Sequence, residues 1–540
     1  MDSLAPNLLE MQRTPLHDSH VEAMREIGVE RSYAKGEIIA EAGSAMCRFR
    51  YILEGEAEVI DPFTGEGFLL HHLGPDQFLG EIAFLNGGKW TLPMRAMTDV
   101  RMLEVEREPM LELMTNIPEM SDIIITVFAG RRRNQIEGNR SSLKLIGADV
   151  DPNIQRIASF AARNRIPFDS YDLNSEEAQE AATECDLAKY GPAVIFGKDN
   201  VIADPTPLKV AEEMGLNLDI AEDEIFDLLI VGSGPAGVAA AVYAGSEGLK
   251  ALVVEDISIG GQAGTSSRIE NYMGFPTGIS GADLVWRGHI QAMKFGTKFA
   301  MPRRVTKLEK REDNLFCVTL DDEQIVCAKS VLVATGVQYR RLPLDRLEEF
   351  EGAGCYYAAT DMEARFCRNT EAVIIGGGNS AGQAAMFLSR TAKHVHLLVR
   401  GKSLAASMSD YLSRRLEADP QITIHYQTEV TALQGDERLN AITVNTPDGT
   451  KSIHTAALFI MVGAAPNSGW LSGLAKTDGK GFVLCGDKAC ADSPFATSHP
   501  GIFAVGDVRA DSVKRVASAV GEGSVVVSKI WDYVKGDAVA

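Results

Sequence analysis

The chain has 540 residues, room for roughly three or four domains at about 150 residues each. Its 53 basic and 74 acidic residues give a formal net charge of −21, which repels nucleic acid and anionic membranes and argues against both as partners. The apolar run at 456–465 is far shorter than the roughly 20 residues of a bilayer span, and the N-terminus has no signal pattern. We therefore expect a soluble, cytoplasmic protein that binds neither nucleic acid nor membrane.

The chain contains eight cysteines, none in a Cys-x-x-Cys motif or at zinc-ligand spacing from a histidine. We therefore expect no metal site. Most of the thiols are expected to be small apolar core residues in a reducing compartment. The cysteines are Cys47, Cys185, Cys317, Cys327, Cys355, Cys367, Cys485 and Cys490.

The N-terminal part begins with a helical segment, and short alternating strands separated by turns follow it. These strands are expected at 37–40, 49–54, 57–60 and 68–73, a pattern typical of a small β-barrel or sandwich. On the segments 52–57 and 78–85, residues 14–137 resemble the cyclic-nucleotide-binding domain family. The resemblance implies a jelly-roll barrel in which the turn at Gly80 and Glu81 faces a cyclic phosphate and Glu81 bonds the ribose.

The sequence departs from this family at the phosphate site. Trp90 occupies the position at which family members have a phosphate-binding arginine, and losing such a contact costs about 2 kcal/mol. Two alternatives stay open: a cyclic nucleotide binds at Gly80 and Glu81, or the module is inert or repurposed for dimerisation or partner docking. The arginines at 131–133 lie near the end of an amphipathic helix, 121–134, and we expect them to complement its C-terminus.

The middle part alternates between strands and helices. The order is strand 143–147, helix 153–163, strand 166–173, helix 176–185, strand 193–196 and helix 207–214. This order resembles the thioredoxin fold, whose redox Cys-x-x-Cys stands at the N-terminus of the first helix. At that place the segment 148–153 contains no cysteine, so we expect an α/β scaffold or docking surface without thiol chemistry.

A first nucleotide-binding pattern occupies residues 226–262. An apolar strand at 226–231 leads into Gly-Ser-Gly-Pro-Ala-Gly at 232–237, an alanine-rich helix and a second strand that ends at Glu255. Such glycines permit a tight turn and the close approach of a pyrophosphate, which the helix N-terminus stabilises, and an acid at that distance accepts the ribose hydroxyls. The expected dinucleotide contacts here are Gly232, Gly234, Pro235, Ala236, Gly237 and Glu255.

A second pattern follows 144 residues later. A strand at 372–375 leads into Gly-Gly-Gly-Asn-Ser-Ala at 376–381, and the next strand, 395–399, ends beside Arg400 instead of an acid. Because arginine can hold a 2′-phosphate that an acid would repel, this site favours NADPH over NADH. The expected contacts are Gly376, Gly378, Asn379, Ser380, Ala381 and Arg400.

On these two turns and further motifs, residues 224–540 resemble the thioredoxin reductase family. The further motifs are Gly-Gly-Gln at 260–262, Ile-Glu-Asn-Tyr at 269–272, Ala-Thr-Gly at 334–336 and Gly-Ile-Phe-Ala-Val-Gly-Asp at 501–507. The resemblance implies a homodimer with FAD in the first site and NADPH in the second, and two Rossmann-like α/β domains, the NADPH domain inserted in the FAD domain. A helix from about residue 512 would point at the flavin. Further FAD contacts are then expected from Gly261, Gln262, Asn271, Thr335, Gly336, Gly506, Asp507 and Ala517.

The sequence departs from this second family at the redox dithiol. Family disulfide reductases carry Cys-Ala-Thr-Cys just before the second turn. Matching the shared Ala-Thr puts Ala358 and Asp361 at the cysteine positions, and counting without gaps puts Ala359 and Met362 there. Neither alignment supplies a thiol to carry electrons away from the flavin.

The two nearest cysteines, Cys355 and Cys367, flank this segment and cannot meet if it is helical. The leading hypothesis is an NADPH-dependent flavoprotein oxidoreductase with an unidentified electron acceptor, regulated by a ligand at Glu81. One alternative is a thioredoxin-disulfide reductase that uses an unrecognised thiol. The other is a flavin-based redox sensor. No catalytic residue is assigned.

The chain is therefore expected to be a multidomain protein. The domains are a cyclic-nucleotide-binding-like barrel at 1–140, a thioredoxin-like domain at 141–220, an FAD domain at 224–340 and 467–540, and an inserted NADPH domain at 341–466.

Overall fold

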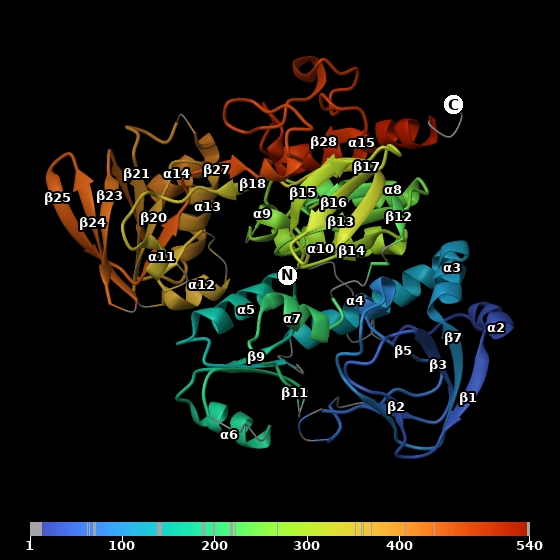
Figure 1. Cartoon of the computed structure of the whole chain (residues 1–540). Helices are drawn as coiled ribbons and strands as arrows, with labels where there is room; N and C mark the ends of the chain where they lie inside the picture. Colours follow the sequence, from blue (N-terminus) through green and yellow to red (C-terminus); the bar gives the residue numbers. More distant parts are fainter. Residues whose placement is uncertain are drawn as a thin grey trace.

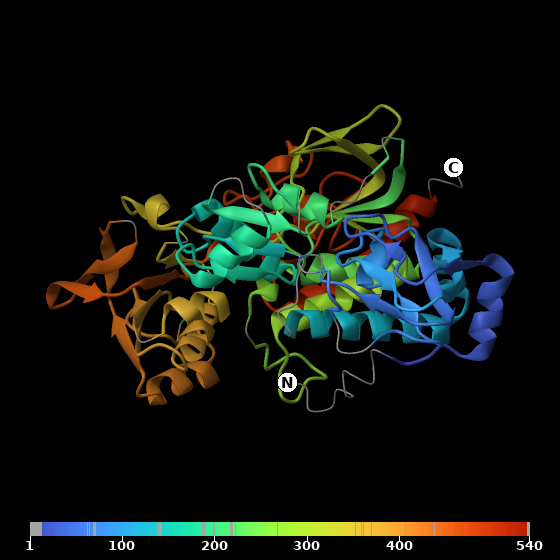
Figure 2. The same ribbon diagram turned by 90° about the horizontal axis from the view of Figure 1, so that it is seen from below.

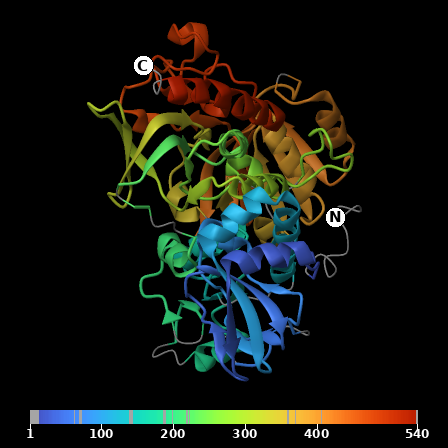
Figure 3. The same cartoon turned by 90° about the vertical axis from the view of Figure 1, so that its right-hand side faces the viewer.

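The N-terminal β-rich unit and the middle α/β unit lie side by side beneath two further α/β units (Figures 1 and 3). Seen from below, the unit that contains β20 to β25 stands at one end of the molecule (Figure 2). The computed structural model describes residues 13–536 except 62, 64, 69–71, 138–142, 186–189, 198–199, 217–219, 222, 267, 352, 358, 360, 369, 406 and 437.

The N-terminal unit is a barrel of two antiparallel sheets. One has the strand order β1 (Val29–Tyr33), β7 (Val100–Glu106), β3 (Arg48–Glu54) and β5 (Phe78–Leu79), and the other β2 (Ile38–Ala40), β6 (Met94–Ala96) and β4 (Ala57–Val59). The helices α2 (Asp18–Ile27), α3 (Arg107–Asn116) and α4 (Pro118–Glu137) accompany them. Four buried rings, those of Phe49, Phe78, Phe84 and Phe128, fill the core with neighbouring centroids 5.2 to 6.4 Å apart. This aromatic core attaches α4 to the barrel.

The middle unit is a four-stranded sheet with helices. Its strand order is β11 (Asn200–Val201), β10 (Ala193–Phe196), β8 (Leu143–Ile146) and β9 (Asp169–Tyr171). β8 and β9 are parallel, whereas β10 is antiparallel to both of its neighbours. Its helices are α5 (Pro152–Arg163), α6 (Glu176–Glu184) and α7 (Pro207–Glu213).

The third unit is built on a seven-stranded sheet. The order is β14 (Lys298–Ala300), β13 (Ala251–Val254), β12 (Ile225–Val231), β17 (Ile325–Val333), β16 (Phe316–Leu320) and β15 (Val305–Lys310), and β28 (Ile502–Ala504) pairs in parallel with β17. The helices α8 (Pro235–Ser246), α10 (Gly281–Lys294) and α15 (Val516–Gly536) pack together on it (Figure 1). The β12 strand is an unbroken apolar run at 228–231 because neighbouring strands enclose it.

The fourth unit has a parallel five-stranded sheet covered on both faces. The order is β19 (Cys355–Tyr356), β26 (Ala457–Ile460), β20 (Glu371–Ile375), β21 (His394–Val399) and β22 (Ile422–Tyr426). One face packs on α13 (Asn379–Leu388) and α14 (Asp410–Ala418). The other packs on the sheet of β23 (Glu429–Gly435), β24 (Leu439–Thr446) and β25 (Gly449–His454).

Two short strands connect these last two units. β18 (Val337–Tyr339) leaves the seven-stranded sheet, β27 (Ala464–Pro466) returns to it, and the two pair with each other. The chain therefore departs after β17 and re-enters with β28, which places the fourth unit as an insertion in the third.

Several expected bounds need correction. The strand expected at 166–173 is limited to β9, because the preceding residues form the loop after α5. The helix expected from residue 512 begins at Val516. The strand expected at 68–73 falls partly on residues outside the described set. Among the described residues, no helix is long and apolar enough to cross a membrane.

Candidate functional site

The turn after β12 has the geometry of a phosphate-binding loop. Gly232 has φ +99°, and a Cβ there would lie 2.6 Å from the Ala334 oxygen. A Cβ on Gly237 would lie 2.0 Å from the oxygen of Gly232, so this glycine lets α8 approach the strand closely. Nothing lies within 4 Å of a Cβ built on Gly234, which leaves its side of the turn open. These are the three separate functions that glycines have in a dinucleotide turn.

The helices that follow the two turns lack side-chain caps. Gly234 is the N-cap of α8 and Gly378 is the N-cap of α13, and neither has a side chain that could bond the first N–H groups. By contrast, Asp151 caps α5 and Ser280 caps α10 through their side chains. The N–H groups at the start of α8 and α13 are therefore available to an anion.

Glu255 lies at the end of β13 beneath the first turn. One carboxylate oxygen accepts the N–H and the hydroxyl of Ser233 at 2.8 Å each, and the other accepts the N–H groups of Ile257 and Ser258. Burial, followed by the nearby Asp256, raises the pKa of Glu255 to about 7. The carboxylate thus holds the backbone of the turn in place at the position expected for the ribose acid.

The other residues expected at FAD surround the edge of this unit. The Gln262 amide donates to the oxygen of Val337, and Thr335 Oγ1 donates to the oxygen of Asn467 at 2.6 Å. These two contacts hold the connections to the inserted unit. Gly261 approaches the first turn, with a Cβ built on it 3.3 Å from the Gly234 Cα.

The positions after β17 and β28 complete this edge. Gly336 and Gly506 have φ +58° and +72°, and burial raises the pKa of Asp507. Asn271 is exposed, and so is Ala517 in the first turn of α15. Whether each of these residues touches FAD stays a prediction.

The second turn repeats the first at the end of β20. A Cβ on Gly376 would lie 2.4 Å from the oxygen of Met461, as one on Gly232 would approach Ala334. The side-chain oxygen of Asn379 accepts the N–H of Ser409 at 2.8 Å, which fixes the start of α14 beside the turn. Arg400 follows β21 and is exposed at the same sheet edge, as expected for a residue that meets a 2′-phosphate.

A partly buried carboxylate behind the first site is absent from the sequence-based expectations. Glu522 accepts the N–H of Gly506 at 2.6 Å and two hydrogen bonds from Arg509 at 3.1 and 2.5 Å. It thereby connects α15 to the turn that ends in Asp507. No local pattern marks this glutamate, because its partners lie at least 13 residues away in the chain.

The segment before the second turn holds two separate thiols. Cys355 and Cys367 are free and buried, and burial raises the pKa of each to about 12. Cys355 packs in the core between the five-stranded sheet and β23 to β25, whereas Cys367 packs on the side of α13. Of the expected cysteine positions, Ala358 lies outside the described residues, as do the side chains of Asp361 and Met362, whereas Ala359 is buried.

The expectation of reduced core thiols is wrong for one pair. Cys317 and Cys327 face each other across β16 and β17 and form a disulfide. Cys47 and Cys490 are exposed rather than buried. Register between two strands, which sequence spacing alone does not give, brings the paired thiols together.

In the N-terminal unit, side chains of the protein itself bond the turn that would meet a cyclic phosphate. Glu81, 6% exposed, accepts the Thr91 hydroxyl at 2.9 Å and lies 3.5 Å from the Arg132 guanidinium. Trp90 is 5% exposed and takes no part in a charged contact with Glu81. The turn follows Gly80, whose oxygen accepts a hydrogen bond from Arg131 at 3.0 Å.

The sequence predicted that the arginines of α4 complement the C-terminus of that helix. The structure corrects this prediction for Arg131 and Arg132, which contact the turn at Gly80 and Glu81 instead. Arg131 reaches back to Gly80, and burial lowers its pKa to about 10. Arg132 pairs with Glu81 instead of remaining in solvent. The helix is long enough, from Pro118 to Glu137, to bring both guanidinium groups over the turn.

Comparison with known proteins identifies two families. Residues 226–523 match the pyridine nucleotide-disulphide oxidoreductase family, and residues 30–116 match the cyclic nucleotide-binding domain. Thioredoxin reductase of Treponema pallidum is 33% identical over 312 residues, which cover 57% of this chain and 97% of that protein. NADPH-dependent thioredoxin reductase 3 of Arabidopsis thaliana is 34% identical over 319 residues, which cover 57% of this chain and 58% of that protein.

Solved structures agree with this assignment. The thioredoxin reductase of Lactococcus lactis, in a crystal structure of its FR conformation, matches with a TM-score of 0.53 and 29% identity over 58% of this chain and 99% of that one. The two glycine turns, their uncapped helices and these matches fit FAD and NADPH. The chain therefore belongs to the pyridine nucleotide-disulphide oxidoreductase family and is a thioredoxin-reductase-like, NAD(P)H-dependent flavoprotein oxidoreductase that uses FAD and NADPH.

Proposed function

We propose that this protein passes electrons from NADPH through FAD to an acceptor that reaches the flavin directly, without a dithiol relay. When bound, FAD accepts a hydride from NADPH and supplies two electrons to the acceptor. The observation that carries the proposal is the position of Cys355 and Cys367 on opposite faces of one sheet. Two thiols separated by a packed sheet cannot form a disulfide without unfolding it.

The disulfide between Cys317 and Cys327 does not replace this relay. Cys327 lies near the start of β17, and the residues expected at FAD follow the other end of that strand. Six residues of extended chain separate Cys327 from Val333, about 20 Å. We therefore assign the disulfide a role in joining β16 to β17 and no role in electron transfer.

The protein's own residues orient the two cofactors. The free N–H groups of α8 and α13 would hold the pyrophosphates, and Arg400 would select NADPH over NADH by its charge. Glu255 and Ser233 fix the first turn. The β18 and β27 connections, held by Gln262 and Thr335, set the position of the inserted unit. A homodimer and a cytoplasmic location remain part of this proposal.

We infer that the N-terminal unit is a docking module and not a cyclic nucleotide sensor. Its turn residue Asn86 exchanges two hydrogen bonds with the backbone of Phe299 in β14, at 3.1 and 3.2 Å. Asp122 pairs with Lys294 of α10 at 2.5 Å. The carboxylate of Glu81 that would meet a ribose already has two partners, and no arginine stands at position 90.

We also infer that the middle unit is a thioredoxin-like scaffold without a dithiol. Its strand order, with a parallel β8–β9 pair and an antiparallel β10–β11 pair, supports this assignment. Asp151 caps α5 with its side-chain oxygen at 2.8 Å from the Asn153 nitrogen, at the place where the redox motif would stand. A carboxylate there satisfies helix N–H groups but exchanges no disulfide.

The test is NADPH oxidation by the flavin-loaded protein with a panel of acceptors: quinones, dyes, oxygen and a protein disulfide. The proposal expects turnover with a one- or two-electron acceptor that needs no thiol, and the same turnover after all eight cysteines are replaced. Disulfide reduction that disappears in that variant would establish the thioredoxin-disulfide reductase alternative. Absence of turnover with every acceptor, together with redox-dependent protein binding, would establish the sensor alternative.

A further inference from the structure

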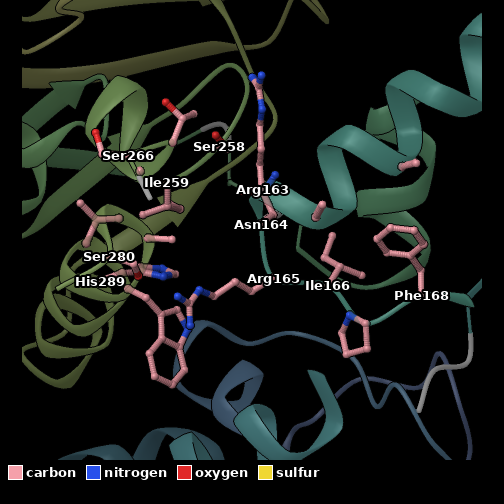
Figure 4. A pocket seen from close by; sticks show the side chains of 18 of the residues that line it. Arg163, Asn164, Arg165, Ile166, Phe168, Ser258, Ile259, Ser266, Ser280 and His289 are labelled. Atoms are coloured by element: carbon pink, nitrogen blue, oxygen red, sulfur yellow. The ribbon is translucent and has the colours of Figure 1, made fainter. Parts of the chain in front are cut away.

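A large cavity lies where all four units meet. Its volume is about 1240 Å³, above the range of roughly 300–1,000 Å³ that is usual for small-molecule sites. The N-terminal unit contributes Arg132, the middle unit the loop at 163–172, the third unit α10 residues, and the fourth unit residues of α13 and α14. Figure 4 shows the loop after α5 facing Ser258, Ile259 and Ser266 across this space.

The cavity is separate from both dinucleotide turns. None of the residues that the sequence assigns to FAD or NADPH lines it. The two sites share a wall, because Ser258, Ile259 and Gly264 line the cavity while the nitrogen of Gly260, between them, donates to the oxygen of Ser233 at 2.8 Å. An occupant of the cavity would therefore press on the backbone that borders the first turn.

The lining is positively charged in a protein with a net charge of −21. Seven arginines and four carboxylates contribute to it. The arginines are Arg132, Arg163, Arg165, Arg268, Arg365, Arg390 and Arg415. Such a concentration of one charge inside a concave site attracts an oppositely charged ligand.

Some of these arginines are already paired. Arg165 lies 2.5 Å from Asp283, and Arg415 lies 3.1 Å from Glu270. Arg163 and Arg390, which come from different units, form no ion pair with any residue in the described part of the chain. Their guanidinium groups remain available to an anion that is large enough to reach both.

Two residues with uncharged polar side chains, Asn164 and His289, also line this space. The side-chain oxygen of Asn164 is buried and has no hydrogen-bond partner among the described residues, although its nitrogen donates to the oxygen of Ile257 at 3.0 Å. His289 lies in the wall, and burial lowers its pKa to about 4, so that the ring is neutral and offers one donor and one acceptor. In Figure 4 Arg165 points toward His289. The Arg165 guanidinium carbon also lies over the ring of Trp286, 5.3 Å from its centroid.

We propose that this cavity binds a multiply phosphorylated small molecule that carries hydroxyl groups, such as a nucleoside polyphosphate or a sugar polyphosphate. Guanidinium groups bind phosphate oxygens in pairs, and arginines from separate units require several phosphates or a long one. The Asn164 oxygen at the wall of the cavity lacks a donor, and a sugar hydroxyl that reaches it would supply one. Arg390 belongs to the turn after α13, so the ligand would join the inserted unit to the middle unit.

The test is calorimetric titration of the full-length, flavin-loaded protein with tripolyphosphate and then with ATP. We expect saturable binding that weakens about tenfold or more in the double variant Arg163→Ala/Arg390→Ala and weakens with added salt. The control variant Arg414→Ala removes an exposed arginine that pairs with Asp410 at 2.9 Å and does not line the cavity. It should bind like the unmodified protein.

Two further variants locate the ligand. Tripolyphosphate binding should survive Arg400→Ala, and its loss there would mean that the anion occupies the NADPH turn and would overturn the proposal. No binding heat, or equal affinity in the double variant, would also overturn it. ATP should bind more tightly than tripolyphosphate, and Asn164→Ala should remove that difference; equal affinities of the two probes would contradict the assigned hydroxyl contact. Unchanged flavin absorbance and far-ultraviolet circular dichroism confirm that each variant is folded.

Discussion

The two dinucleotide turns and the turn at Gly80 and Glu81 in the N-terminal unit all belong to folds that bind phosphate groups. They differ in whether the polar groups of the turn are free or already bonded within the protein. α8 and α13 begin at glycines, with their first N–H groups free of side-chain caps. In the N-terminal unit, Glu81 is bonded to Thr91 and Arg132, and a buried Trp90 stands at the phosphate position. The backbone of a binding fold can therefore persist while its polar groups are redirected into the protein.

The middle unit is a second case in which a fold is present without the reactive side chains, here thiols. Its first helix starts at Pro152 with Asp151 as cap, and in the thioredoxin-like scaffold that we propose a carboxylate stands where the reactive thiol would be. The core of the unit needs only apolar residues such as Leu145 and Ile157, both fully buried. The stability of the fold thus depends on residues other than those that would perform the chemistry.

The largest effect is expected from Gly234→Asp. No atom lies within 4 Å of a Cβ at this position, so the substitution is tolerated sterically, but a carboxylate would stand where the pyrophosphate binds and would repel it. Flavin content, measured by absorbance of the purified protein, should fall about tenfold or more. Gly479→Asp, at another open glycine, should leave flavin content unchanged; full flavin content in Gly234→Asp would show that FAD binds elsewhere.

The next effect concerns the second turn. Arg400→Ala removes the charge that we assign to the 2′-phosphate, and loss of such a contact costs about 2 kcal/mol, or roughly 30-fold in affinity. Steady-state kinetics should show this increase in the KM for NADPH and little change in the KM for NADH. Arg414→Ala serves as control because its side chain is 77% exposed and pairs with Asp410. An equal increase for both nucleotides would refute the assignment of Arg400.

A substitution at Glu81 in the N-terminal unit should change the stability of the protein and not its activity. Glu81→Gln leaves the buried Arg132 without its charged partner, and we expect a loss of about 1–3 kcal/mol in the free energy of unfolding of this unit. Denaturant unfolding measures the loss, with the exposed Glu108→Gln as control. NADPH turnover should not change, and titration with cyclic AMP or cyclic GMP should give no heat; a saturable heat would restore the sensor hypothesis.

The smallest effect is a pH dependence from Glu255. Its pKa rises from 4.5 when unfolded to about 7 in the folded protein, so the folded state binds the proton more tightly. Its contribution to stability is therefore fully present below about pH 4.5 and is lost as the pH rises toward 7. In flavin-free protein, Glu255→Gln should flatten the decrease in unfolding free energy over this interval by an amount on the order of 1 kcal/mol. An identical pH profile in both proteins would contradict a raised pKa.

Local sequence patterns predicted the parts of this molecule that depend on local structure. The apolar strand β12, the glycines of both turns and the helices after them follow from residues that are adjacent in the chain. The contacts of Arg132 with Glu81, 51 residues apart, and of Glu522 with Gly506 depend on how helices pack on distant turns. The disulfide between Cys317 and Cys327 depends on strand register. No spacing rule identifies any of these contacts, so the sequence leaves them open.

The most direct test is an anaerobic titration of the flavin-loaded protein with NADPH, followed by absorbance. If electrons leave the flavin without a dithiol relay, about one equivalent of NADPH per flavin should bleach it completely. The double variant Cys355→Ser/Cys367→Ser should give the same end point. Consumption of about two equivalents before bleaching, reduced to about one in a cysteine-free variant, would show a thiol pair in exchange with the flavin and would contradict the account.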